Sequence, residues 1–96
     1  FSARHYEDLY CRGLLEFWQA RYRNFRFVPT LTRERRAGTA AGRIPELLPE
    51  YFPDLAGFSV FVAGSTAFVD DCVAAVRRCG AVPERIHTEG FVPTPP

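Results

Sequence analysis

The chain has 96 residues, of which 47% are hydrophobic and 15% aromatic, a composition that indicates one packed domain and excludes a disordered chain. The 12 basic and 11 acidic side chains leave a net charge of +1, which favours neither nucleic acid nor an anionic membrane as the main partner. No apolar run approaches the roughly 20 residues that span a bilayer, and no signal-peptide layout opens the chain, so the sequence predicts a soluble, cytoplasmic protein.

Cysteine and histidine spacing bears on metal sites. Cys11, Cys72 and Cys79 show no CxxC or CxxxH spacing, so we expect them to be thiols that face the core. His5 and His87 also stand without ligand spacing, and no metal site is expected. The sequence contains no methionine, not even an initiator, which predicts a chain cut from a longer protein.

The first half of the chain predicts a helix, a strand and a second helix. Over residues 6–22 apolar side chains recur every three or four positions, which indicates an amphipathic helix. Residues 25–31 are rich in β-formers, and Pro29, which has no N–H to donate, places that strand at a sheet edge. Residues 32–42 form an arginine-rich loop in this interpretation, and residues 44–52 a short helix.

The second half continues the alternation. Residues 58–63 are almost continuously apolar, which is typical of a strand buried on both faces of a parallel sheet. The helix that follows is expected over residues 64–79, and a last short strand over residues 85–88. Helices that alternate with strands predict an α/β fold with a parallel sheet. In such sheets ligands bind beyond the carboxyl ends of the strands.

One strand-to-helix turn is a candidate ligand site. At Gly64-Ser65-Thr66 a buried strand meets a helix N-terminus, where free N–H groups favour a phosphate or a polar ligand edge. Gly64 lets the backbone come close to such a ligand. The alternative is that this turn is only a tight connection between the two elements.

The order and spacing of several segments resemble a known family. Residues 54–70 and 83–91 resemble the end of the pyridine-nucleotide-binding domain of ferredoxin-NADP-reductase-like flavin oxidoreductases. They look closest to the NADH-dependent reductase components of bacterial aromatic-ring and methane oxygenases. Residues 3–10 resemble the family's "GAR…DLY" segment and residues 24–34 its next strand and loop, so the resemblance spans nearly the whole chain.

The resemblance implies a fold and a missing part. The fold is a parallel-sheet three-layer sandwich: a partial Rossmann-like NAD(P)-binding domain over residues 1–91, followed by a tail over residues 92–96. The family's first strand and its glycine-rich turn should lie before Phe1, and in the strand order 3-2-1-4-5 this strand is central. Only a remnant of strand 2 remains, near residues 1–4. We therefore expect that the strand at Val60 lacks a partner on one side.

The resemblance also implies a nicotinamide site. It places Gly64, Ser65 and Thr66 against the nicotinamide side of the cofactor, with Phe68 beneath it. The family's Cys-Gly-Pro turn reads Ala63-Gly64-Ser65 here, which opens the alternative of reduced or altered catalysis.

Two further pairs of residues match family positions. Glu89 and Phe91 match a terminal Glu-x-Phe near the flavin, where an aromatic covers the isoalloxazine and a carboxylate tunes proton access; alternatively, Phe91 only packs on the last strand. Arg4 and Arg33 match positions near the adenosine end, where an arginine can pair with a phosphate, so NADPH stays open. No serine-rich cluster of the NADPH-specific plastid type surrounds residues 5–8, which favours NADH.

The function that the resemblance implies is electron transfer. NADH gives a hydride to FAD in an absent neighbouring domain, and electrons then pass singly to a [2Fe-2S] centre, in a ferredoxin or a further absent domain, or to an oxygenase. The partners are thus the missing flavin domain, the first half of the NAD domain and the electron acceptor, and the chain alone is expected to be inactive. The alternatives are a truncated, non-catalytic nucleotide-binding or protein-interaction domain, and a stand-alone α/β protein of unrelated function.

Overall fold

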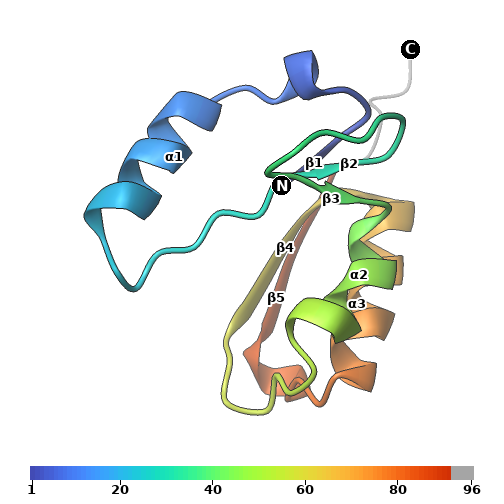
Figure 1. Ribbon diagram of the computed structural model, residues 1–96. Coiled ribbons are helices and arrows are strands. Elements are labelled where there is room, and N and C mark those ends of the chain that lie inside the picture. The colour runs from blue at the N-terminus through green and yellow to red at the C-terminus, as the bar shows by residue number, and fades with distance from the viewer. Residues whose placement is uncertain (92–96) are drawn as a thin grey trace. The chain divides into compact units, whose positions relative to one another are not determined.

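Parallel strands form two small sheets in the computed structural model, which describes residues 1–91 (Figure 1). The chain divides into two compact units, residues 1–44 and residues 45–96. The expected tail over residues 92–96 lies outside the described residues. The elements, with two 3-10 turns called η, are β1 Ser2–Ala3, η1 Tyr6–Asp8, α1 Arg12–Arg21, β2 Thr30–Leu31, β3 Ala40–Ala41, α2 Ile44–Tyr51, β4 Val60–Ser65, α3 Thr66–Arg78, η2 Pro83–Arg85 and β5 Ile86–Phe91.

The sheet of the first unit has the order β1-β2-β3, with all three strands parallel. Thr30 and Leu31 of β2 are buried at its centre, and Leu31 exposes only 1% of its surface. The prediction of an edge strand over residues 25–31 is therefore wrong in position and in length. The predicted loop over residues 32–42 is also wrong in part, because it contains β3.

Pro29 does not force its strand to the edge, because it precedes the hydrogen-bonded ladder. The Pro29 carbonyl accepts from the Ala40 N–H at 2.9 Å. The next N–H along the chain, that of Thr30, donates to the Phe1 carbonyl at 2.9 Å. The N–H that proline lacks falls just before the first residue pair of the β2–β3 ladder, Thr30 with Ala40. A central strand can therefore begin directly after a proline.

The helix predicted over residues 6–22 is interrupted, so that only η1 and α1 are helical. Between them Cys11 adopts the left-handed conformation, with φ 60° and ψ 10°, and Leu9 is buried. α1 buries none of its residues. Helices gain most of their stability from packing an apolar face, so little favours extending α1 within this unit. Cys11 is exposed, which contradicts the expectation that all three thiols face the core.

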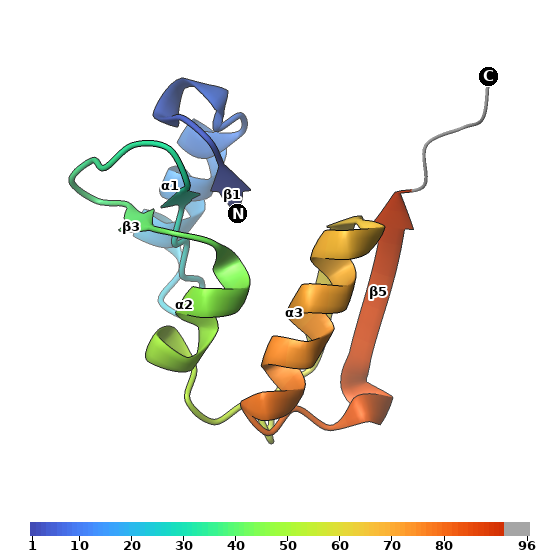
Figure 2. The same ribbon diagram turned by 90° about the vertical axis from the view of Figure 1, so that its right-hand side faces the viewer.

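The second unit is the two-stranded parallel sheet β4-β5 with α3 alongside it (Figure 2). The Ser65 hydroxyl accepts from the Phe68 N–H at 3.3 Å and caps the start of α3. At the other end Gly80, with φ 92°, lets the Ala81 N–H return to the Val76 carbonyl at 2.9 Å. The sequence predicted this helix to within two residues at its start and one at its end.

The core of the second unit lies between the C-terminal half of α3 and the segment that follows α2. Its buried members are Leu55, Val76, Cys79 and Ala81, and the partly buried residues that pack against them are Leu48, Phe52, Val60 and Ile86. Cys72 and Cys79 are buried thiols, as expected. The core therefore holds α2, α3 and both strands of this unit together.

β4 is not buried on both faces, contrary to the prediction. Only Val62 of this strand is buried, and Phe61 exposes 78% of its surface. The reason is that α3 covers one face of the sheet, while Phe61 lies on the other, stacked on His87 with ring centroids 4.8 Å apart. Among the described residues β4 pairs only with β5. No helix within residues 1–91 is long and apolar enough to cross a membrane.

Candidate functional site

The candidate site lies where β4 and β5 end. Because the two strands are parallel and in register, Ala63 pairs with Glu89, Gly64 with Gly90, and Ser65 with Phe91. The strand-to-helix turn and the terminal Glu-Gly-Phe segment, which are distant in sequence, are therefore neighbours at one edge of the sheet. The last strand extends to Phe91, three residues beyond the prediction, and this extension creates the contact.

Gly64 occupies a position that only glycine fits. Its φ of +154° is one that side chains rarely tolerate. A Cβ added to Gly64 would lie 2.7 Å from Cδ2 of the Phe68 ring, which is closer than any real contact. The half-buried Phe68 ring thus packs directly against the bare backbone at the end of β4.

Ser65 and Thr66 line the start of α3. The Ser65 hydroxyl is the helix cap, so one of its hydrogen bonds is committed to the Phe68 N–H. Thr66 Oγ1 lies 3.9 Å from the position that a Cβ on Gly90 would take, so its hydroxyl is next to the glycine of β5. Ser65 or Thr66 was expected from the sequence to cap this helix, and Ser65 is the residue that does so.

Glu89 is an exposed residue of β5. Ile86 and Thr88 line the α3 side of β5, and successive side chains of a strand point to opposite faces. Glu89 therefore lies on the sheet face that α3 does not cover, which we call the open face. His87 and Phe61 lie on the same face, and Ala63 is the strand partner of Glu89. Phe91 is paired in the ladder beside Ser65, and its side chain lies outside the described residues.

Arg4 and Arg33 are brought together in the other unit. Arg4 follows β1 directly and Arg33 lies two residues after β2, and the Arg33 N–H donates to the Arg4 carbonyl at 3.0 Å. Both arginines are exposed. The predicted site residues therefore form two groups: this arginine pair in the first unit, and the Gly64 turn with Glu89 in the second.

Sequence reasoning missed a cluster beside the arginine pair. The Tyr6 ring lies between two guanidinium groups, with the Cζ of Arg12 4.3 Å and that of Arg36 3.9 Å from the ring centroid. The Glu34 carboxylate accepts a hydrogen bond from the Tyr6 N–H and lies 3.9 Å from His5 Nδ1. Such stacking orders the loop that carries Arg33. The arginine-rich composition of residues 32–42 was the only signal for this cluster.

Groups of three or more potential metal ligands are absent from residues 1–91. The titratable side chains of β5 near the Gly64 turn are Glu89 and His87, on the face that α3 does not cover. The site offers backbone donors, hydroxyls and one carboxylate. These groups can hold and orient an organic cofactor.

Comparisons with known proteins give relatives of one kind. No model of a known protein family matches the chain. The chain is 30% identical over 95 residues to the ferredoxin–NAD(P)+ reductase component of naphthalene 1,2-dioxygenase/salicylate 5-hydroxylase systems of a Ralstonia species, covering 98% of this chain and 29% of that protein. It is 34% identical over 86 residues to the reductase subunit of an aromatic O-demethylase of Amycolatopsis, covering 90% of this chain and 26% of that protein.

A solved structure supports the same relationship. The crystal structure of Amycolatopsis cytochrome P450 reductase GcoB matches 96% of this chain and 28% of its own length, with a TM-score of 0.89 and 33% identity. The chain thus spans under a third of the length of the proteins that it matches. Its homologues are reductase components of aromatic oxygenase systems, and the predicted resemblance and α/β fold class are confirmed.

Proposed function

We propose that residues 1–91 are the C-terminal portion of the NAD(P)-binding domain of a cytoplasmic reductase component, with residues 92–96 as its tail. The homologues are NAD(P)H reductase components of oxygenase systems, which supports this assignment. The observation that carries it is the strand-to-helix turn at Gly64, where the Phe68 ring packs on the glycine and a second glycine, Gly90, is its strand partner.

This arrangement fits a flat cofactor ring. Gly64 and Gly90 each stand one residue before the end of their strand, and the Phe68 ring occupies the space that a Gly64 side chain would take, so this ring lines the turn. The first-turn N–H groups of α3 that Ser65 does not satisfy are donors for the nicotinamide carboxamide. The Thr66 hydroxyl, next to Gly90, supplies another hydrogen-bonding group. When bound here, the nicotinamide supplies a hydride to a flavin.

Glu89 and Phe91 complete the proposed site from β5. Glu89 pairs with Ala63, one residue before the glycine turn, so its carboxylate stands at the rim of the site. There it orients donors of the cofactors and sets proton access. We assign the Phe91 ring to the flavin side on the family resemblance alone. Ala63, which replaces the family's cysteine, has no side chain that reaches the ring.

Arg4 and Arg33 are proposed to hold the adenosine end of the cofactor. Their backbones are hydrogen-bonded to one another and both side chains are exposed, and guanidinium groups bind phosphate oxygens well. The neighbouring Glu34 carboxylate opposes a further phosphate in the same loop by like-charge repulsion. This supports NADH over NADPH as the cofactor.

The remaining parts of the scheme belong to chain outside these 96 residues. FAD and the rest of the NAD domain would be supplied by that chain, and electrons would leave the flavin singly for a [2Fe-2S] centre in a ferredoxin or further domain, or for an oxygenase. The coverage of 26–29% of the relatives' length leaves room for such domains.

The test is NADH oxidation by the full-length protein with ferricyanide as electron acceptor. Gly64→Ala should lower kcat/KM about 100-fold, because a displacement of about 1 Å in a reacting geometry has that effect. Gly57→Ala is the matched control, since a Cβ at Gly57 meets nothing within 4 Å. A protein that retains FAD yet does not oxidise NADH would overturn the proposal, and a higher kcat/KM for NADPH would overturn the cofactor assignment.

A non-catalytic nucleotide-binding or protein-interaction domain is the second candidate. The departures at Ala63 and Ser65 from the family's Cys-Gly-Pro turn favour it. In that case NADH binding, measured by calorimetry, would remain while flavin reduction in stopped-flow experiments would be absent.

A further inference from the structure

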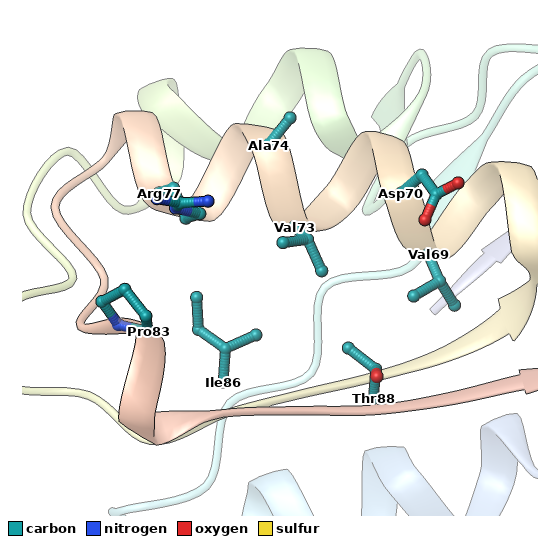
Figure 3. A pocket seen from close by; sticks show the side chains of 8 residues that line it. All are labelled: Val69, Asp70, Val73, Ala74, Arg77, Pro83, Ile86 and Thr88. Carbon is teal, nitrogen blue, oxygen red and sulfur yellow. The ribbon is translucent and has the colours of Figure 1, made fainter.

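A groove runs between α3 and the outer edge of β5 (Figure 3). Its volume is about 440 Å³. α3 contributes Val69, Asp70, Val73, Ala74 and Arg77. These residues recur at intervals of three and four, so they form one flank of the helix.

The floor of the groove is the edge strand itself. Figure 3 shows Ile86 and Thr88 of β5 pointing toward α3, with Val73 above the interval between them. No residue of β4 lines the groove, so it lies on the side of β5 away from β4. Among the described residues β5 pairs only with β4, and its outer row of backbone groups has no strand partner. An unpaired edge is a template for another strand.

We propose that this groove and edge form an isologous interface with a second copy of the chain, in which the two β5 strands pair antiparallel. The two-fold axis would pass through the centre of the groove, near Val73 and His87. Each end of the groove in one copy would then contact the opposite end of the groove in the other copy. The result is a continuous sheet in the order β4-β5-β5-β4, with both α3 helices on the same face.

Charge complementarity is the reason to choose a second copy over another partner. Asp70 and Arg77 lie on the same flank of α3, on either side of Val73 and Ala74. The two-fold axis sets Asp70 of one copy opposite Arg77 of the other, twice. The same axis sets Arg85, the last residue of η2, opposite Glu89 in β5 of the other copy. A surface with this order of charges is complementary to itself and to few other surfaces.

The expected distance between the two α3 helices also agrees with such a dimer. Adjacent strands lie about 4.8 Å apart, and a helix that sits above the interval between β4 and β5 is about 2.4 Å inside β5. The two α3 helices would then be about 10 Å apart, the distance at which helices pack. Val73 and the small Ala74 are the residues at that contact. The apolar groove of each copy would be filled by the α3 flank of the other.

The test is a charge swap on the full-length protein. The unmodified protein is expected to show a concentration-dependent monomer–dimer equilibrium in analytical ultracentrifugation. Asp70→Arg and Arg77→Asp should each raise the dimer dissociation constant at least about tenfold, because each places like charges opposite one another twice. The double variant should have the dissociation constant of the unmodified protein again, and so should an equimolar mixture of the two single variants.

The swap separates loss of the interface from loss of folding. Both substituted side chains are exposed, so the thermal melts of the single variants should match that of the unmodified protein. An unmodified protein that stays monomeric when its concentration in the ultracentrifuge is raised about 100-fold would overturn the proposal. So would a dimer that the single variants do not weaken, or that the double variant does not restore. Loss of NADH oxidation is not expected in any of these variants.

Discussion

Gly64 is the residue on which the candidate site depends most. Two constraints meet there, a φ of +154° and a Phe68 ring that leaves no room for a Cβ. The same glycine pairs with Gly90 across the two strands and lets Phe68 pack against the end of β4. A change at this position therefore affects both the stability of the turn and the shape of the proposed nicotinamide site.

Gly64→Ala is expected to destabilise the protein by about 1–3 kcal/mol, because an inserted methyl group in a filled space forces its neighbours to move. Chemical unfolding in urea measures this. Phe68→Ala in the same chain removes the atom that the methyl group would meet, so the double variant should lose less than the sum of the two single variants. Strictly additive losses would show that the clash with Phe68 is not the cause.

Ser65 is a helix cap before it is a ligand-binding residue. Ser65→Ala removes the acceptor for the Phe68 N–H and should cost about 0.5–2 kcal/mol in free energy of unfolding. Ser65→Thr and Ser65→Asp, which keep an acceptor, should cost less. If Ser65→Ala unfolds at the same denaturant concentration as the unmodified protein, the cap does not stabilise α3.

Among the elements, α3 is predicted most accurately because its signals are local. Its cap, its inward-facing residues and its terminal glycine all lie within or next to the helix. The strand over residues 25–31 was predicted at an edge because Pro29 was considered without its neighbours along the ladder. The β2–β3 pairing shows that a proline one residue before a ladder leaves every pair intact.

The open face of the β4-β5 sheet is expected to behave differently in the chain and in a complete domain. In residues 1–96 alone, Phe61→Ala should change the free energy of unfolding by no more than about 0.5 kcal/mol, because Phe61 is 78% exposed. In the full-length protein the three-layer sandwich that the resemblance implies would cover this face, and the loss should then reach about 3–5 kcal/mol. Val76→Ala, at a site 2% exposed, should destabilise both forms. Equal, small effects of Phe61→Ala in both forms would show that the face stays uncovered.

At the scale of the whole molecule, the strand pairing is limited among the described residues. β4 has one strand partner among the described residues, and the two sheets are not joined by any described strand pair. The resemblance assigns the missing central strand and the phosphate-binding turn to chain outside these residues. Cooperativity and cofactor binding should both depend on that chain.

The isolated 96-residue chain is expected to be marginally stable, to retain no FAD and to leave NADH unoxidised, because its proposed nicotinamide site lacks a flavin and a phosphate cradle. Thermal unfolding by circular dichroism and a ferricyanide assay check this. A monomer that melts cooperatively and reduces ferricyanide with NADH would contradict it. The full-length protein in the same assay is the positive control.

The sequence by itself determined the alternation of helices and strands, the α3 helix and the kind of protein that the chain resembles. These follow from local periodicity, capping residues and motifs that lie close together along the chain. Only the tertiary structure decided that β2 lies at the centre of its sheet, that β4 has an open face, and that β5 extends to meet the Gly64 turn. Those properties depend on which strands become neighbours. The residues of one strand do not show which distant strand will be its hydrogen-bond partner, so the sequence of that strand alone does not predict the pairing.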